Sequence, residues 1–490
     1  MLRKSSMITL LAALAAGPVW AAPDTLPSTE LLPVVPGDPE TRSTPFIAWF
    51  MDLSEDGYVE DEFAVSGDAD IYGYVDDAGQ SPEVEVIEAG VPYTTRILVR
   101  RPADPSRFNG TVFYEVLNAT AGWDGDPIWQ SNFEYITREG AIWVGMSTKP
   151  VTVDFLRDGW GSWFLVTRNA DRYANLAMPQ FGQVWDMLSQ TGLLMKTPDH
   201  PDNPVAGYDV ERIILVGYSQ SAAYQVTYLN SFHDAAMEPD GSPIIDGYYI
   251  SAGGDNGKHV TGPTTSTPEN LPDGAARNFL RTPAPAIRFQ TQTEVVGFPS
   301  YTVRQSEPGT PWMRFYELAG GSHVDERINE VGGQALVRDL GLPPSFCPAP
   351  AVPYNPIIIG NTQSALLHRL DAWIADGTEP PPSRFMELDM SGPVSIVLDG
   401  DGNAVGGIRP PQIEVPLGTY LPNNTGPGFC FLFGGFDPFD DDTVADRYRN
   451  SGQYVSRFVQ AVKQSQKEGF LLKEEAADLR RRAAQAGVSK

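Results

Sequence analysis

The sequence contains few cysteines and few histidines. Of its 490 residues, two are cysteine, Cys347 and Cys430, and five are histidine. Neither cysteine has a second cysteine or a histidine at the spacing of a zinc site, so we expect no metal centre. A reaction that needs an imidazole base therefore has only five candidates for it.

Basic residues and long apolar runs are also scarce. The chain has 35 Lys and Arg against 62 Asp and Glu, a formal net charge of -27. Such an acidic surface repels nucleic acid, and we expect none as a partner. Downstream of Ala22, no stretch offers the ~18 uninterrupted apolar residues that a membrane-spanning helix needs, so we predict no stable membrane span.

Residues 1–22 have the composition of a targeting segment. Arg3 and Lys4 precede an apolar run at residues 7–16, and small residues suited to a cleavage site follow it. This order predicts a Sec-type signal peptide and a secreted or periplasmic protein. Since exported proteins fold in oxidising surroundings, we expect the two cysteines to form one disulfide.

Apolar runs alternate with amphipathic segments along most of the chain. Several runs, such as residues 213–216, are continuously apolar, as in strands that are buried on both faces of a parallel sheet. The strand candidates are residues 62–75, 94–99, 111–117, 141–147, 212–217, 247–251, 286–291 and 313–318. The helix candidates are residues 132–138, 175–191, 221–232 and 364–375. This alternation predicts an α/β fold with a mostly parallel central sheet flanked by helices.

The strongest local motif is Gly217-Tyr218-Ser219-Gln220-Ser221. It directly follows a strand candidate and directly precedes a helix candidate. A serine in a sharp strand-to-helix turn, with small residues two before and two after it, is typical of the nucleophile elbow of α/β-hydrolases. Gly217 and Ser221 are both small, although glycine is commoner at the second position. A turn serine that only caps a helix is the alternative interpretation.

A nucleophilic serine needs a base and an acid. His323 lies in the Gly-rich segment after the last strand candidate, as the chain order serine, acid, histidine requires. Glu294 follows the preceding strand candidate, and we expect it to orient the His323 ring. His259, in a Gly-rich loop, is the weaker candidate for the base. The remaining histidines lie in a Pro/Asp-rich loop, at the end of a helix candidate and within a helix candidate: His200, His233 and His368. The rival acids are Glu317, Asp325 and Asp255.

Two backbone N–H groups are expected to hold the oxyanion that forms when the serine attacks. The first is that of Gln220, at the start of the helix after the elbow. The second belongs to Asn118 or Ala119, which follow the strand candidate 111–117.

Residues 399–403 resemble the start of a calcium loop, but Ala404 and Pro410 stand where glycine and glutamate are required, so we interpret residues 399–403 as a turn.

The region after Pro380-Pro381-Pro382 has a different character. We predict a catalytic domain at residues 23–383 and, packed on it, a C-terminal β/α extension at residues 384–490. The extension should contain short strands near residues 394–398. It should end in a helix at residues 453–484 that is broken around Gly469.

Several separated blocks of the chain are similar to a bacterial α/β-hydrolase-domain family of serine esterases. The resemblance runs from about Thr94 to Val488. It rests on residues 110–118, 141–147, 217–221, 290–294, 317–323, 402–403 and 406–409. It implies an α/β-hydrolase fold with serine at 219, base at 323 and acid at 294. The family more often has aspartate where Glu294 stands, and tryptophan where Val116 stands.

The sequence thus predicts an exported carboxylesterase that cleaves small-molecule or polymeric esters through an acyl-enzyme, without a cofactor. A lactonase, an amidase or a peptidase could use the same residues. An inactive binding protein on the same fold is the alternative from another class.

Overall fold

The computed structural model describes residues 25–32, 44–75, 81–159, 172–254, 257–261, 284–306 and 312–486. The predicted signal peptide and the rival acid Asp255 lie outside these residues.

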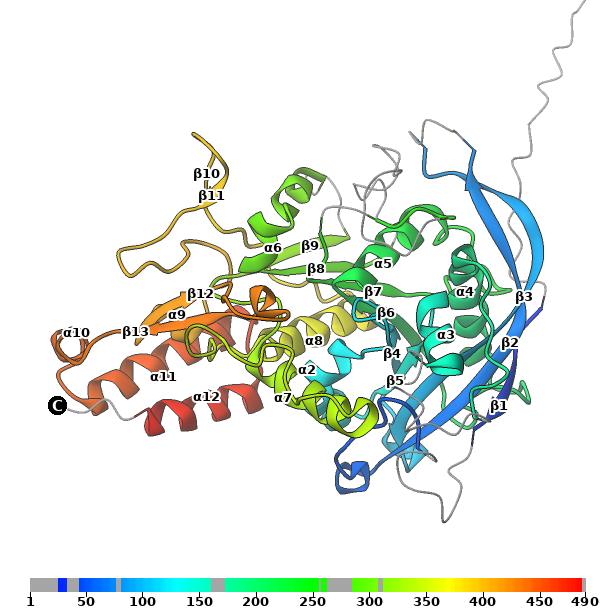
Figure 1. Ribbon diagram of the computed structural model, residues 1–490, viewed down its shortest axis with the longest axis horizontal. Coiled ribbons are helices and arrows are strands. Elements are labelled where there is room, and N and C mark those ends of the chain that lie inside the picture. The colour runs from blue at the N-terminus through cyan, green and yellow to red at the C-terminus, as the bar shows by residue number, and fades with distance from the viewer. Residues whose placement is uncertain are drawn as a thin grey trace, which may run out of the picture.

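A nine-stranded sheet forms the centre of the fold (Figure 1). Its strand order is β1-β2-β3-β5-β4-β6-β7-β8-β9. The strands from β5 to β9 pair in parallel, whereas β1, β2 and β3 add an antiparallel edge. The strands are β1 Ser28–Leu31, β2 Tyr58–Tyr74, β3 Val84–Pro102, β4 Thr111–Val116, β5 Ile142–Met146, β6 Arg212–Tyr218, β7 Gly247–Ser251, β8 Ala286–Thr291 and β9 Met313–Leu318. The predicted α/β architecture is confirmed.

The strand order fixes where a site can form. After β4 the chain adds β5 on one side, and it then crosses to β6 on the other side of β4. In open α/β sheets, such a reversal leaves a crevice outside the carboxyl ends of the strands. Residues 117–119 and 219–221 lie at these ends of β4 and β6, so the elbow and the predicted oxyanion loop are neighbours.

Helices cover both faces of the parallel strands. In Figure 1, α2 and α8 lie on one side of these strands, and α4 and α5 lie on the other. The helices of this part are α2 Pro127–Glu139, α3 Pro150–Asp158, α4 Val184–Met195, α5 Gln220–Ser231, α6 Gln292–Gly297, α7 Glu326–Ala335 and α8 Gly360–Asp376. Helix α8 ends at Gly377, whose φ of 77° closes the helix in the left-handed conformation.

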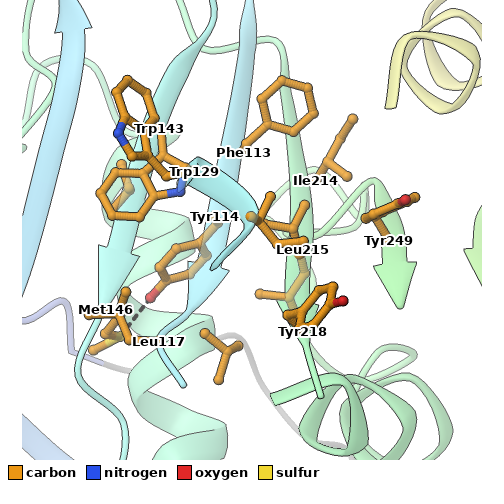
Figure 2. Close-up of a cluster of buried hydrophobic side chains, with 14 of the residues drawn as sticks. Phe113, Tyr114, Leu117, Trp129, Trp143, Met146, Ile214, Leu215, Tyr218 and Tyr249 are labelled. Carbon is orange, nitrogen blue, oxygen red and sulfur yellow. Dashed lines mark hydrogen bonds between the residues drawn. The ribbon is translucent and has the colours of Figure 1, made fainter. Parts of the chain in front are cut away.

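Aromatic and branched side chains fill the space between the sheet and its helices (Figure 2). Phe113 and Tyr114 come from β4, and Ile214 and Leu215 come from β6. Trp129 of α2 packs against Trp143 of β5, with ring centroids 5.5 Å apart. All six side chains are buried, and burial of each contributes about 1.5–3 kcal/mol or more to stability.

The C-terminal part of the chain contacts the last strand of the sheet. Residues 316 and 318 of β9 form isolated bridges with residues 384 and 408. The elements of this part are β10 Leu388–Asp389, β11 Ser395–Ile396, α9 Pro411–Glu414, β12 Gly418–Leu421, β13 Gly435–Pro438, α10 Asp441–Arg447, α11 Ser451–Glu468 and α12 Lys473–Gln485. The predicted terminal helix is indeed broken at Gly469, which ends α11 with a φ of 89°. Residues of α11 and α12 form a separate hydrophobic core cluster that includes Tyr454, Phe458 and Val462.

Candidate active site

Ser219 lies in a strained turn between β6 and α5. Its φ of 58° and ψ of -120° place it in a region that non-glycine residues rarely occupy. Its N–H donates to Ser251 O at 2.8 Å, which fixes the turn to the end of β7. A Cβ on Gly217 would lie 2.9 Å from Ser221 O, so this turn requires glycine two residues before the serine. The backbone therefore has the form of a nucleophile elbow.

Glu294 and His323 form a buried hydrogen-bonded pair. His323 Nδ1 lies 2.7 Å from Glu294 Oε1, and the side chains are 7% and 0% exposed. The other oxygen, Oε2, accepts from the N–H of Thr291 at 2.6 Å and from its hydroxyl at 2.8 Å. These bonds exist because Glu294 stands in the first turn of α6 and completes the capping box with Thr291. The carboxylate is therefore oriented with one oxygen toward the imidazole.

The loop that carries His323 is attached to the elbow and to the start of α6. Tyr218, the residue before Ser219, donates its hydroxyl hydrogen to His323 O, and their ring centroids are 5.4 Å apart. His323 N donates to Thr293 Oγ1 at 3.1 Å. Within the described residues, no hydrogen bond joins the Ser219 hydroxyl to His323. In unliganded enzymes this bond is often long, and it tightens when substrate binds.

The predicted oxyanion donors differ in availability. The N–H of Asn118 donates to Gly125 O at 2.8 Å, so it cannot serve as the second donor in this conformation. The N–H of Ala119 has no partner among the described residues. Asn118 instead acts through its side chain, whose Nδ2 donates to Tyr218 O at 2.9 Å. The structure thus joins the loop after β4 to the elbow, with Ala119 on that loop and Gln220 as the first residue of α5.

The rival acids have other partners. Glu317 pairs with Arg304 at 2.6 Å and accepts from Met386 N at 2.7 Å. Asp325 accepts from Ile328 N and Ile359 N at 2.8 and 2.7 Å. Both carboxylates thereby fix backbone segments around the site.

The other histidines lie in unrelated surroundings. His233 Nδ1 bonds to Tyr248 at 2.7 Å, and His259 Nδ1 bonds to Thr261 at 2.9 Å. His200 lies 3.9 Å from the carboxylate of Asp202, and His368 packs on Tyr135. His323 differs from them in its contact with a fully buried carboxylate, that of Glu294.

Lys149, which the sequence analysis did not select, lies fully buried beneath the elbow. Its Nζ donates to Leu117 O and, at 3.0 Å, to Ser221 Oγ. Burial lowers the pKa of this amine to about 7, although the carboxylate of Asp124 opposes the shift. The signal in the sequence is a lysine three residues after the buried strand β5, where an unpaired charge is costly.

The disulfide joins Cys347 to Cys430 and lies beside the loop of His323. Val324, the next residue after the histidine, donates its N–H to Leu432 O at 2.9 Å. Leu432 belongs to the short helical turn that begins at Cys430. The crosslink therefore holds the segment on which the histidine loop rests.

The acidic loop near residue 400 is a turn closed by the carboxylate of Asp399. Asp399 accepts from the N–H groups of Asp401 and Asn403, each at 3.0 Å.

Among the described residues, no three His, Cys, Asp or Glu side chains gather as metal ligands would. The helices in the described ranges include none with the length and apolar character of a membrane span.

The chain matches one family model and is similar to several solved structures. A family model described as "Alpha/beta hydrolase domain" matches residues 27–481. No curated protein is significantly similar in sequence. Among solved structures, the chain is similar to a thermostable esterase from Pseudomonas putida ECU1011, with 14% identity and a TM-score of 0.31 over 55% of this chain and 74% of that one.

Two further solved structures are similar to the chain at the same low level. The carboxylesterase Cest-2923 from Lactobacillus plantarum WCFS1 is 16% identical, with a TM-score of 0.30 over 46% of this chain and 78% of that one. Methylesterase BT1017 is 13% identical, with a TM-score of 0.28 over 54% of this chain. The match spans 50% of the methylesterase, half of its length.

Proposed function

The chain belongs to the family of alpha/beta hydrolase domains, and on that premise we propose that it is a serine hydrolase that cleaves carboxylic esters through Ser219, His323 and Glu294. The observation that carries the proposal is the Glu294–His323 pair, which contacts the residue before the strained serine. With one oxygen the carboxylate caps the start of α6, and with the other it fixes a buried imidazole, which helix capping alone does not need. It is the arrangement that a serine nucleophile requires.

The first half of the reaction is acylation. Ser219 Oγ attacks the ester carbonyl while the free nitrogen of His323, Nε2, accepts the hydroxyl proton. The carbonyl oxygen becomes an oxyanion and accepts from the N–H groups of Gln220 and Ala119. The carbon–oxygen bond to the alcohol then breaks, and His323 returns the proton to the leaving alcohol. Glu294 stabilises the imidazolium that exists between these two transfers.

Deacylation follows the same steps, with water as the nucleophile and Ser219 as the leaving group. Water attacks the acyl-serine while His323 accepts its proton, and a second oxyanion forms at the same two N–H groups. Collapse expels Ser219, which regains its proton from His323, and releases the carboxylic acid. Atoms balance with one water consumed per ester, and no cofactor is required.

A lactone, an amide or a peptide would undergo the same acyl transfer. We propose the ester because an alcohol is a better leaving group than an amine, although His323 would protonate either one. We also propose export: the composition of residues 1–22 supports it, and a disulfide persists best in an oxidising compartment.

Ser219→Ala tests the proposal. Hydrolysis of p-nitrophenyl acetate and butyrate should fall by about three orders of magnitude or more. A fluorophosphonate probe should label the wild type at Ser219 and leave the variant unlabelled. Ser391→Ala, which changes an exposed serine, should behave as the wild type. Hydrolysis or labelling that survives in Ser219→Ala would exclude this nucleophile, and an unlabelled wild type would favour an inactive binding protein.

A further inference from the structure

Lys149 occupies a place that the catalytic proposal does not use. It follows β5, precedes α3 and is fully buried. Its Nζ donates to Leu117 O and to Ser221 Oγ, and the Ser221 hydroxyl donates to the same Leu117 O at 3.1 Å. The three groups form a closed triangle of hydrogen bonds. Nζ also lies 4.7 Å from the centre of the Tyr224 ring, which covers it from α5.

The triangle joins the two segments that present the oxyanion donors. Leu117 directly precedes Asn118 and Ala119, and Ser221 directly follows Gln220. Figure 2 shows Leu117 and Tyr218 at the ends of neighbouring strands β4 and β6. A second bond, from Asn118 Nδ2 to Tyr218 O, joins the same segments. Together the two connections hold the chain on both sides of Gln220 and at the two residues before Ala119.

We propose that Lys149 is a positioning residue, which sets the separation of the Gln220 and Ala119 N–H groups by joining Leu117 to Ser221. The proposal rests on the proposed function, since it concerns the oxyanion of that reaction. Oxyanion donors act only when they lie 2.7–3.1 Å from the developing charge, so the separation of the two loops governs the rate. It also explains why serine stands at 221, where glycine is commoner: glycine has no hydroxyl to complete the triangle.

A second nucleophile at Ser221 is not an alternative. Lysine does activate serine in some hydrolases. Here Ser221 is fully buried, and its hydroxyl hydrogen is donated to a carbonyl oxygen. The charged groups that act on Lys149 are Asp124 and Glu115, which favour its ammonium form, and Lys258, which opposes it. Asp124 is paired with Arg96 at 3.0 Å, so it does not hold Lys149 directly.

Lys149→Met and Ser221→Ala test the proposal, because each variant removes one hydrogen-bonding side-chain group from the triangle. Each variant is titrated with a fluorophosphonate probe, and kcat is expressed per labelled site. We expect the endpoint of labelling to stay complete and kcat on p-nitrophenyl butyrate to fall about 10- to 100-fold, with KM changed less than about threefold. Because both residues act through one triangle, the double variant should lose no more than the worse single variant.

Lys196→Met is the matched control. The Lys196 side chain is only 5% exposed, and it pairs with Glu238 and Asp246 at 2.8 and 2.9 Å near the amino end of β7. This variant should lose stability and keep its kcat. An unchanged kcat in Lys149→Met and Ser221→Ala, or an equal fall in Lys196→Met, would overturn the positioning role. The positioning role would also be overturned if kcat of the double variant fell by the product of the two single losses. A wild type that neither hydrolyses esters nor takes the label would instead refute the proposed function, and with it this inference.

Discussion

Glu294 gives one carboxylate oxygen to His323 and the other to Thr291, so that the imidazole and the start of α6 hold it from both sides. Glu294→Gln keeps the size of this side chain but can present an amide N–H to the imidazole. The ring would then adopt the wrong tautomer, and kcat should fall ~10³–10⁴-fold with little change in KM. Steady-state kinetics on p-nitrophenyl butyrate measure the effect.

The family's usual aspartate supplies the control for this change. Glu294→Asp keeps the charge but shortens the reach, so it should lose far less activity than the glutamine variant. If both variants kept the wild-type kcat, Glu294 would be a structural capping residue only.

Tyr218→Phe tests the contact between the elbow and the histidine loop. The variant removes the hydroxyl that donates to His323 O. Stability should fall by ~1 kcal/mol for the lost bond, and kcat should fall several-fold because the imidazole is less well placed. Tyr448→Phe removes a similar bond, to Pro416 O at 2.8 Å, far along the chain. That control should lose stability alone, as measured by urea unfolding.

The sheet was predictable because its strands carry continuous apolar runs. All five residues of β5 are apolar and buried, and all six residues of β4 are buried as well. Helix α7 was missed because it contains Gly332 and Gly333, which are poor helix formers. A Cβ at Gly333 would lie 2.3 Å from Pro344 O, so tertiary packing requires this glycine against the local preference.

The helix predicted from residue 175 begins only at Val184. Ala177 pairs with Thr94 instead, donating to its carbonyl oxygen at 2.8 Å and extending the sheet edge locally. A partner about eighty residues away in sequence thus overrides an amphipathic pattern, which no local window can detect.

The candidate site was predictable only where its signals are local. The elbow, the Gly-rich loop before His323 and the position of Glu294 after β8 are all short patterns next to strand ends. The contacts of Lys149 are with Leu117 and Ser221, which come from two other segments. The loss of Asn118 as a donor depends on a turn that returns the chain to Gly125. Both facts require three-dimensional structure.

The disulfide supplies a further prediction, because the turn that begins at Cys430 supports Val324 beside His323. The paired change Cys347→Ser and Cys430→Ser should lower stability by ~4 kcal/mol, on the chain-entropy account of a long loop. It should also lower kcat at temperatures well below the unfolding midpoint. Calorimetry with and without reductant measures the first effect, and kinetics the second. Reductant should lower the stability of the wild type but not that of the variant in which both cysteines are replaced. If reductant lowered the stability of that variant equally, it would act at a site other than the disulfide.

The pH dependence of stability should report the buried Lys149 amine. Its pKa is lowered to about 7 in the folded protein, whereas an unfolded lysine titrates near ~10.4. Between these values the unfolded chain binds more protons, so this group makes the free energy of unfolding rise with pH. Below about pH 7 both states are protonated, and the cost of the buried charge is constant at a few kcal/mol.

Lys149→Met isolates this contribution, because every other titrating group is shared with the wild type. The variant should gain most over the wild type at or below about pH 7, and the gap should close by about pH 10. Urea unfolding of both proteins across that range measures it. Parallel pH profiles would mean that the amine keeps its ordinary pKa. If the gap closes as expected while kcat of the variant is low, the protein retains a destabilising buried lysine because the oxyanion loops need the connection that it makes.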